Sequence, residues 1–486
     1  MKKLKIVMCI CSCTLAVALI PINLFLCEMP LWISLIVGAV AIILLCNILR
    51  GIYSKRTKII FSVVTVICVA FSLFGSFCNP FWNSLLLRVN ANYKCIGYDK
   101  TVGSYDAVKD LDYVMTYLKK IHPACRNGLS KDVSEKYSDV RNEILNLDNL
   151  TTNELTYKIE SVLSLLGDGH TAAHALIHNE DKRYLKDYQS WVDKGYQISM
   201  LNGMTIEEML DKYSDYYSYE TKITERDSLE KDIWLLNKLD YLGFDTDMGI
   251  HYTYENSVGD KQQVTYYTGD FIPYGKYAEL NHINNDENKD FVYYEIDEEK
   301  SRAVLTLLSC EYNEQYKNMV RKMFLDVKDK GIKNVVVDLR ENGGGSSFVI
   351  YEFIRYLDTY SYKIPTSERR CGPFVFSFGK GVKKNKRYEG ELFDGNVYIV
   401  TSAYTFSSAM EFAQIIKDNN LGLIVGGASG EKTDSYGECA EFVTPHAGIY
   451  FQISSAKFFR ADRKFKDELV TPDIECDSVE ALSYIP

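Results

Sequence analysis

The sequence predicts a mixed α/β protein that begins with a membrane anchor of three transmembrane helices. Three apolar runs open the chain, at residues 6–27, 31–49 and 59–78, and each has about the length that crosses the hydrocarbon core of a bilayer. From residue 290 onward, strand and helix patterns alternate, which is typical of a mostly parallel sheet covered by helices. A chain of 486 residues is also too long for one simple hydrophobic core. We therefore expect an anchor followed by several packed units.

Basic residues around the apolar runs predict their orientation. Three lysines precede the first run and four basic residues separate the second run from the third, whereas the turn at Glu28–Pro30 has none. The positive-inside rule then places the N-terminus in the cytoplasm. A cleaved signal peptide would explain the first run but not the other two. We expect residues 1–89 to be a multi-pass anchor in the cell membrane, with everything after Cys78 outside the cytoplasm.

Charge and cysteine usage exclude several classes of partner. The formal net charge is −10, yet the first 90 residues carry eight basic residues and one acid, so the remainder carries −17. An acidic remainder offers no basic face to phosphates, which argues against nucleic acid. The thirteen cysteines include no CxxC pair, so no zinc site is expected. No metal and no organic cofactor is implied.

Three units follow the predicted anchor. Residues 104–181 are predicted to be mainly helical, because apolar residues recur there at three- and four-residue spacing. Residues 182–285 mix strand and helix patterns and form an insert. Residues 286–486 form the α/β core, in which Asn334–Leu339 is a buried strand and Ser407–Lys417 a helix.

Three short polar segments are candidates for chemistry. Gly167–Thr171 (GDGHT) contains His170, which can act as a general base because its pKa lies near working pH. In Asp338–Gly345 a buried strand runs into three glycines, whose N–H groups can hold an oxyanion. In Thr405–Glu411 two serines stand at a predicted helix N-terminus, which favours negative charge. Taken singly, the three segments also fit a helix C-cap, a glycine-rich loop and an N-cap.

Together and in this order, the segments resemble peptidase family S41, the C-terminal-processing or tail-specific proteases. The family has a DLRxNxGG turn, a nucleophile segment close to SAxxE and, in one branch, a GDGHT segment. Residues 426–437 and 470–474 resemble its later motifs, and 118–123 its opening helix. The resemblance runs from about residue 105 to 480 and implies a ClpP/crotonase-like core. The insert lies where many members carry a PDZ-like module, and Ile198–Leu210 resembles part of one.

The resemblance also implies roles for single residues. Ser408 would be the nucleophile, with Ser407 as the fallback. The N–H groups of Gly344 and Ala409 would form the oxyanion hole, and Gly345 would help bind the substrate. The four residues that carry over in this way are Ser408, Gly344, Gly345 and Ala409.

The general base has two candidates. One branch of the family uses a Ser–Lys dyad, in which Lys432 would be the base after its pKa is lowered by burial. Another uses histidine and a carboxylate, here His170 with Asp467 or Glu468. We favour His170, because a neutral imidazole needs no large pKa shift at neutral pH.

These inferences predict a membrane-anchored serine endopeptidase that hydrolyses extracytoplasmic polypeptides. The alternative is a catalytically inactive S41-like module that binds peptides or other ligands without cleaving them.

Overall fold

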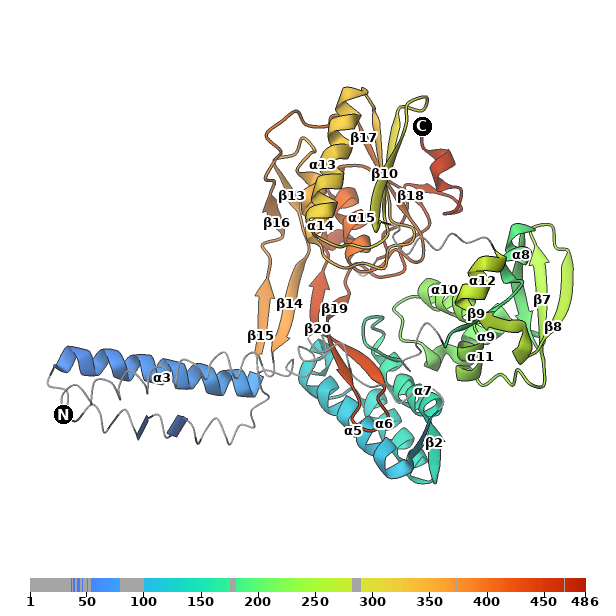
Figure 1. Ribbon diagram of the computed structural model, residues 1–486. Coiled ribbons are helices and arrows are strands. Elements are labelled where there is room, and N and C mark those ends of the chain that lie inside the picture. The colour runs from blue at the N-terminus through green and yellow to red at the C-terminus, as the bar shows by residue number, and fades with distance from the viewer. Residues whose placement is uncertain are drawn as a thin grey trace.

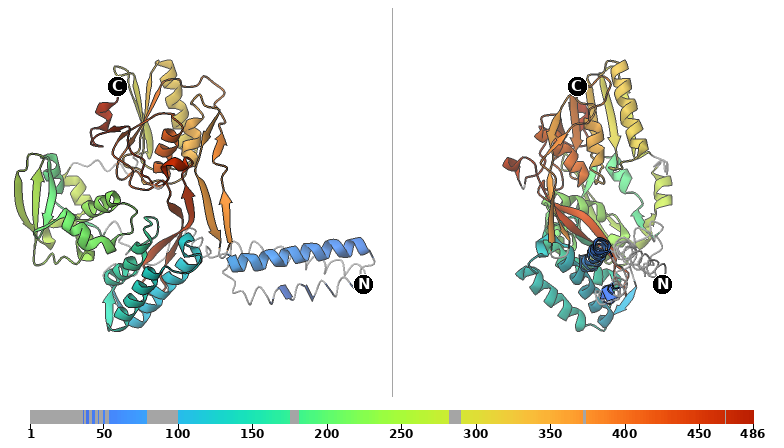
Figure 2. Two further views of the ribbon diagram at one scale, coloured as in Figure 1. Left: turned by 180° about the vertical axis from the view of Figure 1, so that it is seen from behind. Right: turned by 90° about the vertical axis from the view of Figure 1, so that its left-hand side faces the viewer.

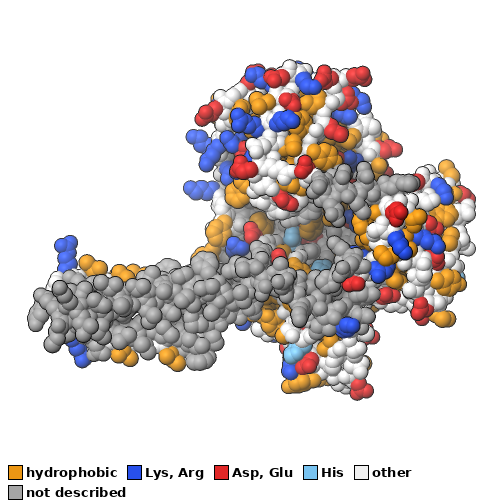
Figure 3. Space-filling model, in the orientation of Figure 1, with side chains coloured by type: hydrophobic (Ala, Val, Ile, Leu, Met, Phe, Trp, Pro, Cys, Tyr) orange, Lys and Arg blue, Asp and Glu red, His pale blue; other side chains and the backbone are white. Residues whose placement is uncertain are grey.

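The computed structural model describes residues 54–78, 100–174, 181–281, 290–371, 374–466 and 468–486, together with single positions between residues 36 and 50. Figure 1 shows an α/β core at the top, a helical part below it and the insert at the right. The space-filling view is hollowed where these three units meet (Figure 3). The site described below lies at this junction.

The core is built on a six-stranded sheet in the order β10-β11-β12-β17-β18-β21. β10 pairs antiparallel with β11, and the other neighbours are parallel, so the predicted mostly parallel sheet is confirmed. All five side chains of β12 are buried, because both faces of the sheet are covered. The strands are β10 (Val292–Asp297), β11 (Arg302–Leu307), β12 (Asn334–Asp338), β17 (Asn396–Thr401), β18 (Leu423–Gly426) and β21 (Ile474–Glu475).

Three helices bury their apolar stripes in one large hydrophobic cluster on this sheet. A short 3₁₀ helix near the C-terminus packs in a smaller cluster with the other side chains of the same strands. The helices are α13 (Glu314–Asp329), α14 (Phe348–Ile354) and α15 (Ser408–Asp418), and the 3₁₀ helix is η7 (Ala481–Tyr484). A two-stranded ladder at the side of the core joins β13 (Ser361–Lys363) to β16 (Val382–Lys384).

Long antiparallel strands connect the core to the helical part (Figure 1). Their order is β15-β14-β20-β19, and β3 pairs with β20. Apolar residues of β19 and β20 share a hydrophobic cluster with the helices below, so this ribbon of strands is part of the core of the helical part. The elements are β3 (Ala172–His174), β14 (Thr366–Cys371), β15 (Phe374–Phe378), β19 (Tyr436–Val443), β20 (Tyr450–Phe459), α5 (Ser104–Ile121), α6 (Lys131–Leu145) and α7 (Thr152–Leu163), with the short ladder of β1 (Thr101–Gly103) and β2 (Asn149–Thr151).

The insert has its own aromatic-rich hydrophobic core. A four-stranded antiparallel sheet, in the order β6-β5-β7-β8, packs with short helices. Its elements are β4 (Arg183–Leu185), α8 (Tyr188–Asp193), β5 (Tyr196–Leu201), β6 (Met204–Thr205), α9 (Ile206–Tyr213), η4 (Ser214–Tyr216), α10 (Lys222–Asp232), α11 (Leu236–Tyr241), β7 (Ile250–Asn256), β8 (Lys261–Tyr266), β9 (Phe271–Pro273) and α12 (Tyr274–Leu280).

The predicted anchor of three transmembrane helices is wrong for the part of the chain that the structure describes. Among these residues, none of the helices combines the length and apolar character that crossing a bilayer requires. α3 (Lys55–Cys78) opens on three basic residues, and serine and threonine side chains interrupt its apolar sequence. Figure 2 shows this helix projecting from the rest of the molecule. The runs predicted at 6–27 and 31–49 lie outside the described residues, apart from single positions.

Candidate active site

Ser407 has a strained backbone at the junction of a buried strand and a helix. β17 ends at Thr401, α15 begins at Ser408, and Ser407 is the residue before the helix. Its φ of 54° and ψ of −127° lie outside the regions that residues with a side chain commonly adopt. Strain of this kind persists where the surroundings hold it, and it is concentrated at functional sites. A sharp strand-to-helix turn also carries the nucleophile in α/β-hydrolases.

The glycine turn packs directly against Ser407. Gly344 has a φ of 109°, and a Cβ placed on it would lie 2.5 Å from Ser407 Cβ and 3.1 Å from Ser407 Oγ. Only glycine permits this approach. Asn342 shapes the turn, since its Oδ1 accepts from the Gly344 N–H at 2.8 Å and its Nδ2 donates to the Leu307 carbonyl at 2.8 Å. The turn is therefore fixed beside the Ser407 hydroxyl.

The backbone N–H groups near Ser407 differ in their availability. The Gly344 N–H is bonded within the glycine turn, and the Ala409 N–H donates to the Phe406 carbonyl at 3.0 Å. The N–H groups of Gly345 and Ser408 have no acceptor within the described part of the chain. The Ser408 N–H belongs to the first turn of α15, where the helix favours negative charge. It is thus the donor best suited to an oxyanion formed at Ser407.

His170 lies beside the residue that precedes Ser407. Its ring centroid is 4.7 Å from that of Phe406, and a Cβ on Gly169 would lie 3.0 Å from the Phe406 ring. Glycine before His170 therefore allows the two rings to approach. The Nδ1 atom of His170 lies 3.6 Å from Oε1 of Glu431. The imidazole is thus adjacent to the strand–helix junction, with one ring nitrogen facing a carboxylate.

Glu431 connects His170 to Ser407. Its side chain is 1% exposed, and its Oε2 accepts a hydrogen bond from the Ser407 backbone N–H. Burial raises the pKa of Glu431, while the nearby His170 acts in the opposite direction. One buried carboxylate therefore contacts both the backbone that carries the serine and the ring that would act on it.

The insert reaches into this site through Glu220. The Lys432 N–H donates to Glu220 Oε2 at 3.2 Å, and Thr221 Oγ1 donates to the Gly430 carbonyl at 2.8 Å. Burial, followed by the charges of Glu431 and Asp168, raises the pKa of Glu220. A protonated Glu220 avoids a second negative charge beside Glu431. The insert thus contacts the core at the two residues that flank Glu431.

A buried pair supports the segment that carries His170. Asp168 Oδ2 lies 3.0 Å from His122 Nε2, and neither side chain is exposed. Asp168 also accepts from the His170 N–H at 2.9 Å and from Thr171 Oγ1 at 2.6 Å. Burial alone would raise the pKa of Asp168, but the hydrogen bond and charge of His122 outweigh it and lower the pKa to about 2. The charged Asp168 therefore fixes the backbone at His170.

Three of these side chains bring potential metal ligands together. Asp168, His170 and Glu220 each place one donor atom within 4.8 Å of the others. The Asp168 oxygens already accept bonds from His122, Thr171 and the His170 backbone. We therefore interpret the cluster as a hydrogen-bonded carboxylate network around the imidazole.

Ser408, the predicted nucleophile, faces a different set of groups. Its side chain is 7% exposed, and its Oγ donates to the Gly345 carbonyl at 2.9 Å. It also lies 3.2 Å from Ser347 Oγ, which donates to Glu411. These bonds tie the first turn of α15 to the glycine turn.

Lys432 and Glu468, the other two predicted site residues, are not brought to the serines. Both side chains are exposed. They are linked to the site only through the backbone, since the Lys432 N–H bonds Glu220 and the Glu468 carbonyl accepts from Thr433 Oγ1 at 2.8 Å. Asp467 lies outside the described residues.

Sequence reasoning did not select Glu431 and Glu220. Glu431 precedes Lys432 in the segment 426–437, which resembles a motif of the family. The motif does not show that the Glu431 side chain lies beside His170. Glu220 lies in the insert with no motif around it. Only the fold brings it to residues 168–170 and 430–432.

Comparisons with known proteins give one family match and several similar solved structures. Residues 303–476 match the model of peptidase family S41. The structure of mature CPAF complexed with lactacystin is similar, with a TM-score of 0.55 and 12% identity over 79% of this chain and 97% of that chain. The photosystem II D1 C-terminal processing protease matches with a TM-score of 0.42 and 12% identity, over 78% of this chain and 96% of that chain. No curated protein sequence matches.

The likeness to CPAF shows a shared fold, and the family model covers the strand, glycine turn and serine segment of the core. Residues 303–476 are thus similar to peptidase family S41, and this match supports a serine-type peptidase.

Proposed function

We propose that this peptidase is an endopeptidase that cleaves polypeptides with Ser407 as nucleophile, His170 as general base and Glu431 as the carboxylate that orients His170. The observation that carries the proposal is the double contact of Glu431, which accepts from the Ser407 N–H and faces His170 Nδ1. The separation of 3.6 Å is longer than a hydrogen bond. If it shortens in the substrate complex, the contact would hold the tautomer in which Nε2 is free to accept a proton.

The reaction then proceeds in two halves. His170 Nε2 takes the proton of Ser407 Oγ as the oxygen attacks the peptide carbonyl carbon. The Ser408 N–H and an N–H of the glycine turn hold the oxyanion. His170 passes the proton to the leaving amine, which leaves an acyl group on Ser407. His170 then takes a proton from a water molecule, whose oxygen attacks the acyl carbon. As the acid product leaves, His170 returns the proton to Ser407 Oγ and the serine is restored.

This assignment takes Ser407 in place of Ser408 and Glu431 in place of Glu468. The Ser408 hydroxyl already donates to Gly345, and Glu468 is exposed. A Ser–Lys dyad is not favoured, because a lysine base is activated by burial in an apolar pocket and the Lys432 side chain is exposed.

Variant activity on an unfolded protein tests the assignment. Ser407→Ala and His170→Ala are expected to abolish cleavage, whereas Lys432→Ala, an exposed neighbour of Glu431, is expected to retain it. Loss of activity in Lys432→Ala but not in His170→Ala would establish the dyad instead. A folded chain that binds peptides yet cleaves none would establish the alternative, a binding module.

The location of the substrates outside the cytoplasm stays a prediction. It rests on basic residues around apolar runs that lie mostly outside the described part of the chain. Digestion of intact cells with an added protease would test it: an accessible core agrees with an outside location, and a core that is cleaved only after lysis contradicts it.

A further inference from the structure

A pocket of about 530 Å³ adjoins the proposed reaction centre. Gly169, Gly343 and Phe406 line one side of it, and each is the chain neighbour of a residue in the proposed site. Residues of the insert and of the helical part, together with Ala403 and Tyr404 of the core, line the rest. A substrate held at Ser407 would therefore have this pocket beside its scissile bond.

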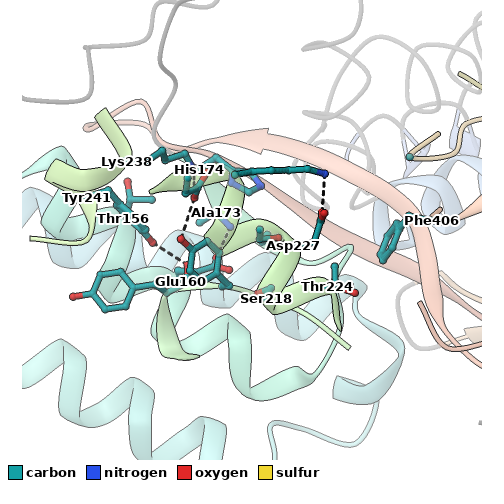
Figure 4. A pocket seen from close by; sticks show the side chains of 18 of the residues that line it. Thr156, Glu160, Ala173, His174, Ser218, Thr224, Asp227, Lys238, Tyr241 and Phe406 are labelled. Carbon is teal, nitrogen blue, oxygen red and sulfur yellow. Dashed lines mark hydrogen bonds and ion pairs between the residues drawn. The ribbon is translucent and has the colours of Figure 1, made fainter. Parts of the chain in front are cut away.

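Figure 4 shows how the lining side chains are arranged. Phe406 stands on one side of the pocket and Glu160, from α7, on the other, with Thr224 and Asp227 of the insert between them. A side chain that enters past Phe406 is therefore directed along the insert toward Glu160.

Glu160 is a buried carboxylate without a cationic partner. Its side chain is 2% exposed, and its Oε2 accepts from the Ala173 N–H at 2.7 Å. No lysine or arginine of the described residues lies within ion-pair distance of it. A buried charge is retained at a cost unless it is paired, which makes Glu160 a candidate for pairing with a substrate.

The other charges of the pocket are already paired with one another. Lys231 lies 2.7 Å from Asp227, and Lys238 lies 3.2 Å from Asp232. Three acids and two lysines line the pocket, so Glu160 is the acid left over. Glu160 is therefore the carboxyl group of the pocket with which a substrate cation can still pair.

Ser218 lies beside Glu160 in Figure 4 and favours the charged form of its carboxyl group. The Oγ atom of Ser218 is buried. An ammonium group has three donors and a guanidinium five, so either can bond to Glu160 and Ser218 together. An apolar side chain would leave Glu160 without a counter-charge.

We propose that this pocket receives a lysine or arginine side chain of the polypeptide substrate, whose cationic group pairs with Glu160. The inference rests on the proposed peptidase activity and names its substrate preference. A carboxylate in a substrate pocket selects basic side chains in the same way in other serine proteases. Burial raises the pKa of Glu160 to about 7, and a bound cation would favour the charged form.

The first test is a cleavage map of the wild-type chain. An unfolded protein is digested and the cut sites are identified by mass spectrometry. We expect lysine and arginine to be enriched at one fixed position relative to the cut. Enrichment of apolar residues at every selective position, or no preference, would overturn the inference while leaving the peptidase activity intact. Absence of any Ser407-dependent cut would instead overturn the proposed function and this inference with it.

The second test compares Glu160→Gln with Glu143→Gln. The first substitution keeps an acceptor for the Ala173 N–H but removes the charge. Glu143 is a 60% exposed acid on α6 that is paired with Lys158, away from the pocket.

The two variants are compared on two peptides that differ only in having lysine or norleucine at the selective position. Glu160→Gln is expected to lower kcat/KM for the lysine peptide roughly 10-fold or more and to leave the norleucine peptide unchanged. Equal loss on both peptides would contradict the inference, and Glu143→Gln should change neither. If Glu160→Gln does not fold, the cleavage map decides alone.

Discussion

Nδ1 of His170 lies 3.6 Å from Oε1 of Glu431. The two residues are 261 positions apart in sequence, and they come from the helical part and from the core. The proposed site is therefore assembled only when both units are folded against each other.

Glu431→Gln is expected to reduce kcat strongly while the chain stays folded. The amide keeps an oxygen for the Ser407 N–H but cannot hold a charged imidazole, and it can stabilise the wrong tautomer. We expect a loss of roughly 100- to 10,000-fold in kcat. Steady-state kinetics on a quenched peptide measure it. Glu438→Gln, at a half-exposed surface acid paired with Arg369, is the control, and a similar loss in that variant would count against the role of Glu431.

Gly344→Ala is expected to remove activity and lower stability. The alanine would have to keep a φ of 109° with its Cβ 2.5 Å from Ser407 Cβ. Strain of this kind costs about 1–3 kcal/mol of unfolding free energy, and relief of the clash displaces Ser407. Gly275→Ala in α12, where an added Cβ meets nothing within 4 Å, is the matched control. Denaturant unfolding and peptide hydrolysis are measured on both, and normal activity in Gly344→Ala would refute the close contact.

The predictability of this site from sequence differs from residue to residue. The ordered motifs locate the glycine turn, the serine pair and His170, because each motif is a local backbone feature. The choice between Ser407 and Ser408 depends on which residue begins α15 and on a strained φ, and a pattern does not specify either to within one position.

The partners of His170 could not be predicted in the same way. Glu431 becomes the nearest carboxylate only through the pairing of β3 with the long ribbon and the packing of Phe406. Glu220 belongs to the insert, whose sequence contains no motif that indicates a catalytic or binding role. The predicted transmembrane helices are wrong where the structure describes the chain, because none of the helices there has the length and apolar character of a span.

Asp168 is expected to contribute to stability in a pH-dependent way. Its pKa is lowered to about 2 in the folded chain, against about 3.9 in an unfolded one. The stabilisation is therefore present above about pH 4 and is lost as the pH falls through the folded value, by roughly 2.6 kcal/mol in all. Asp168→Asn should lose this part of the pH dependence between about pH 5 and pH 2. Unfolding curves measured across that range test it, and parallel curves for variant and wild type would contradict it.

The preference for basic side chains is expected to increase with pH. Burial raises the pKa of Glu160 to about 7, so its carboxyl group is mostly neutral below that pH and charged above it. The ratio of kcat/KM for a lysine peptide to that for a norleucine peptide should rise between about pH 6 and pH 8. The ratio should be flat in Glu160→Gln, because the variant lacks this carboxyl group. The other titratable groups that line the pocket, among them His174, Lys238 and Asp232, are the same in both proteins. A rise of equal size in the variant would assign the effect to another group.

The most direct test of the account is the site of covalent labelling by a serine-reactive fluorophosphonate, located by tandem mass spectrometry in the wild-type chain. The account predicts an adduct on Ser407, full labelling in Ser408→Ala and none in Ser407→Ala or His170→Ala. An adduct on Ser408 that persists in Ser407→Ala would contradict it.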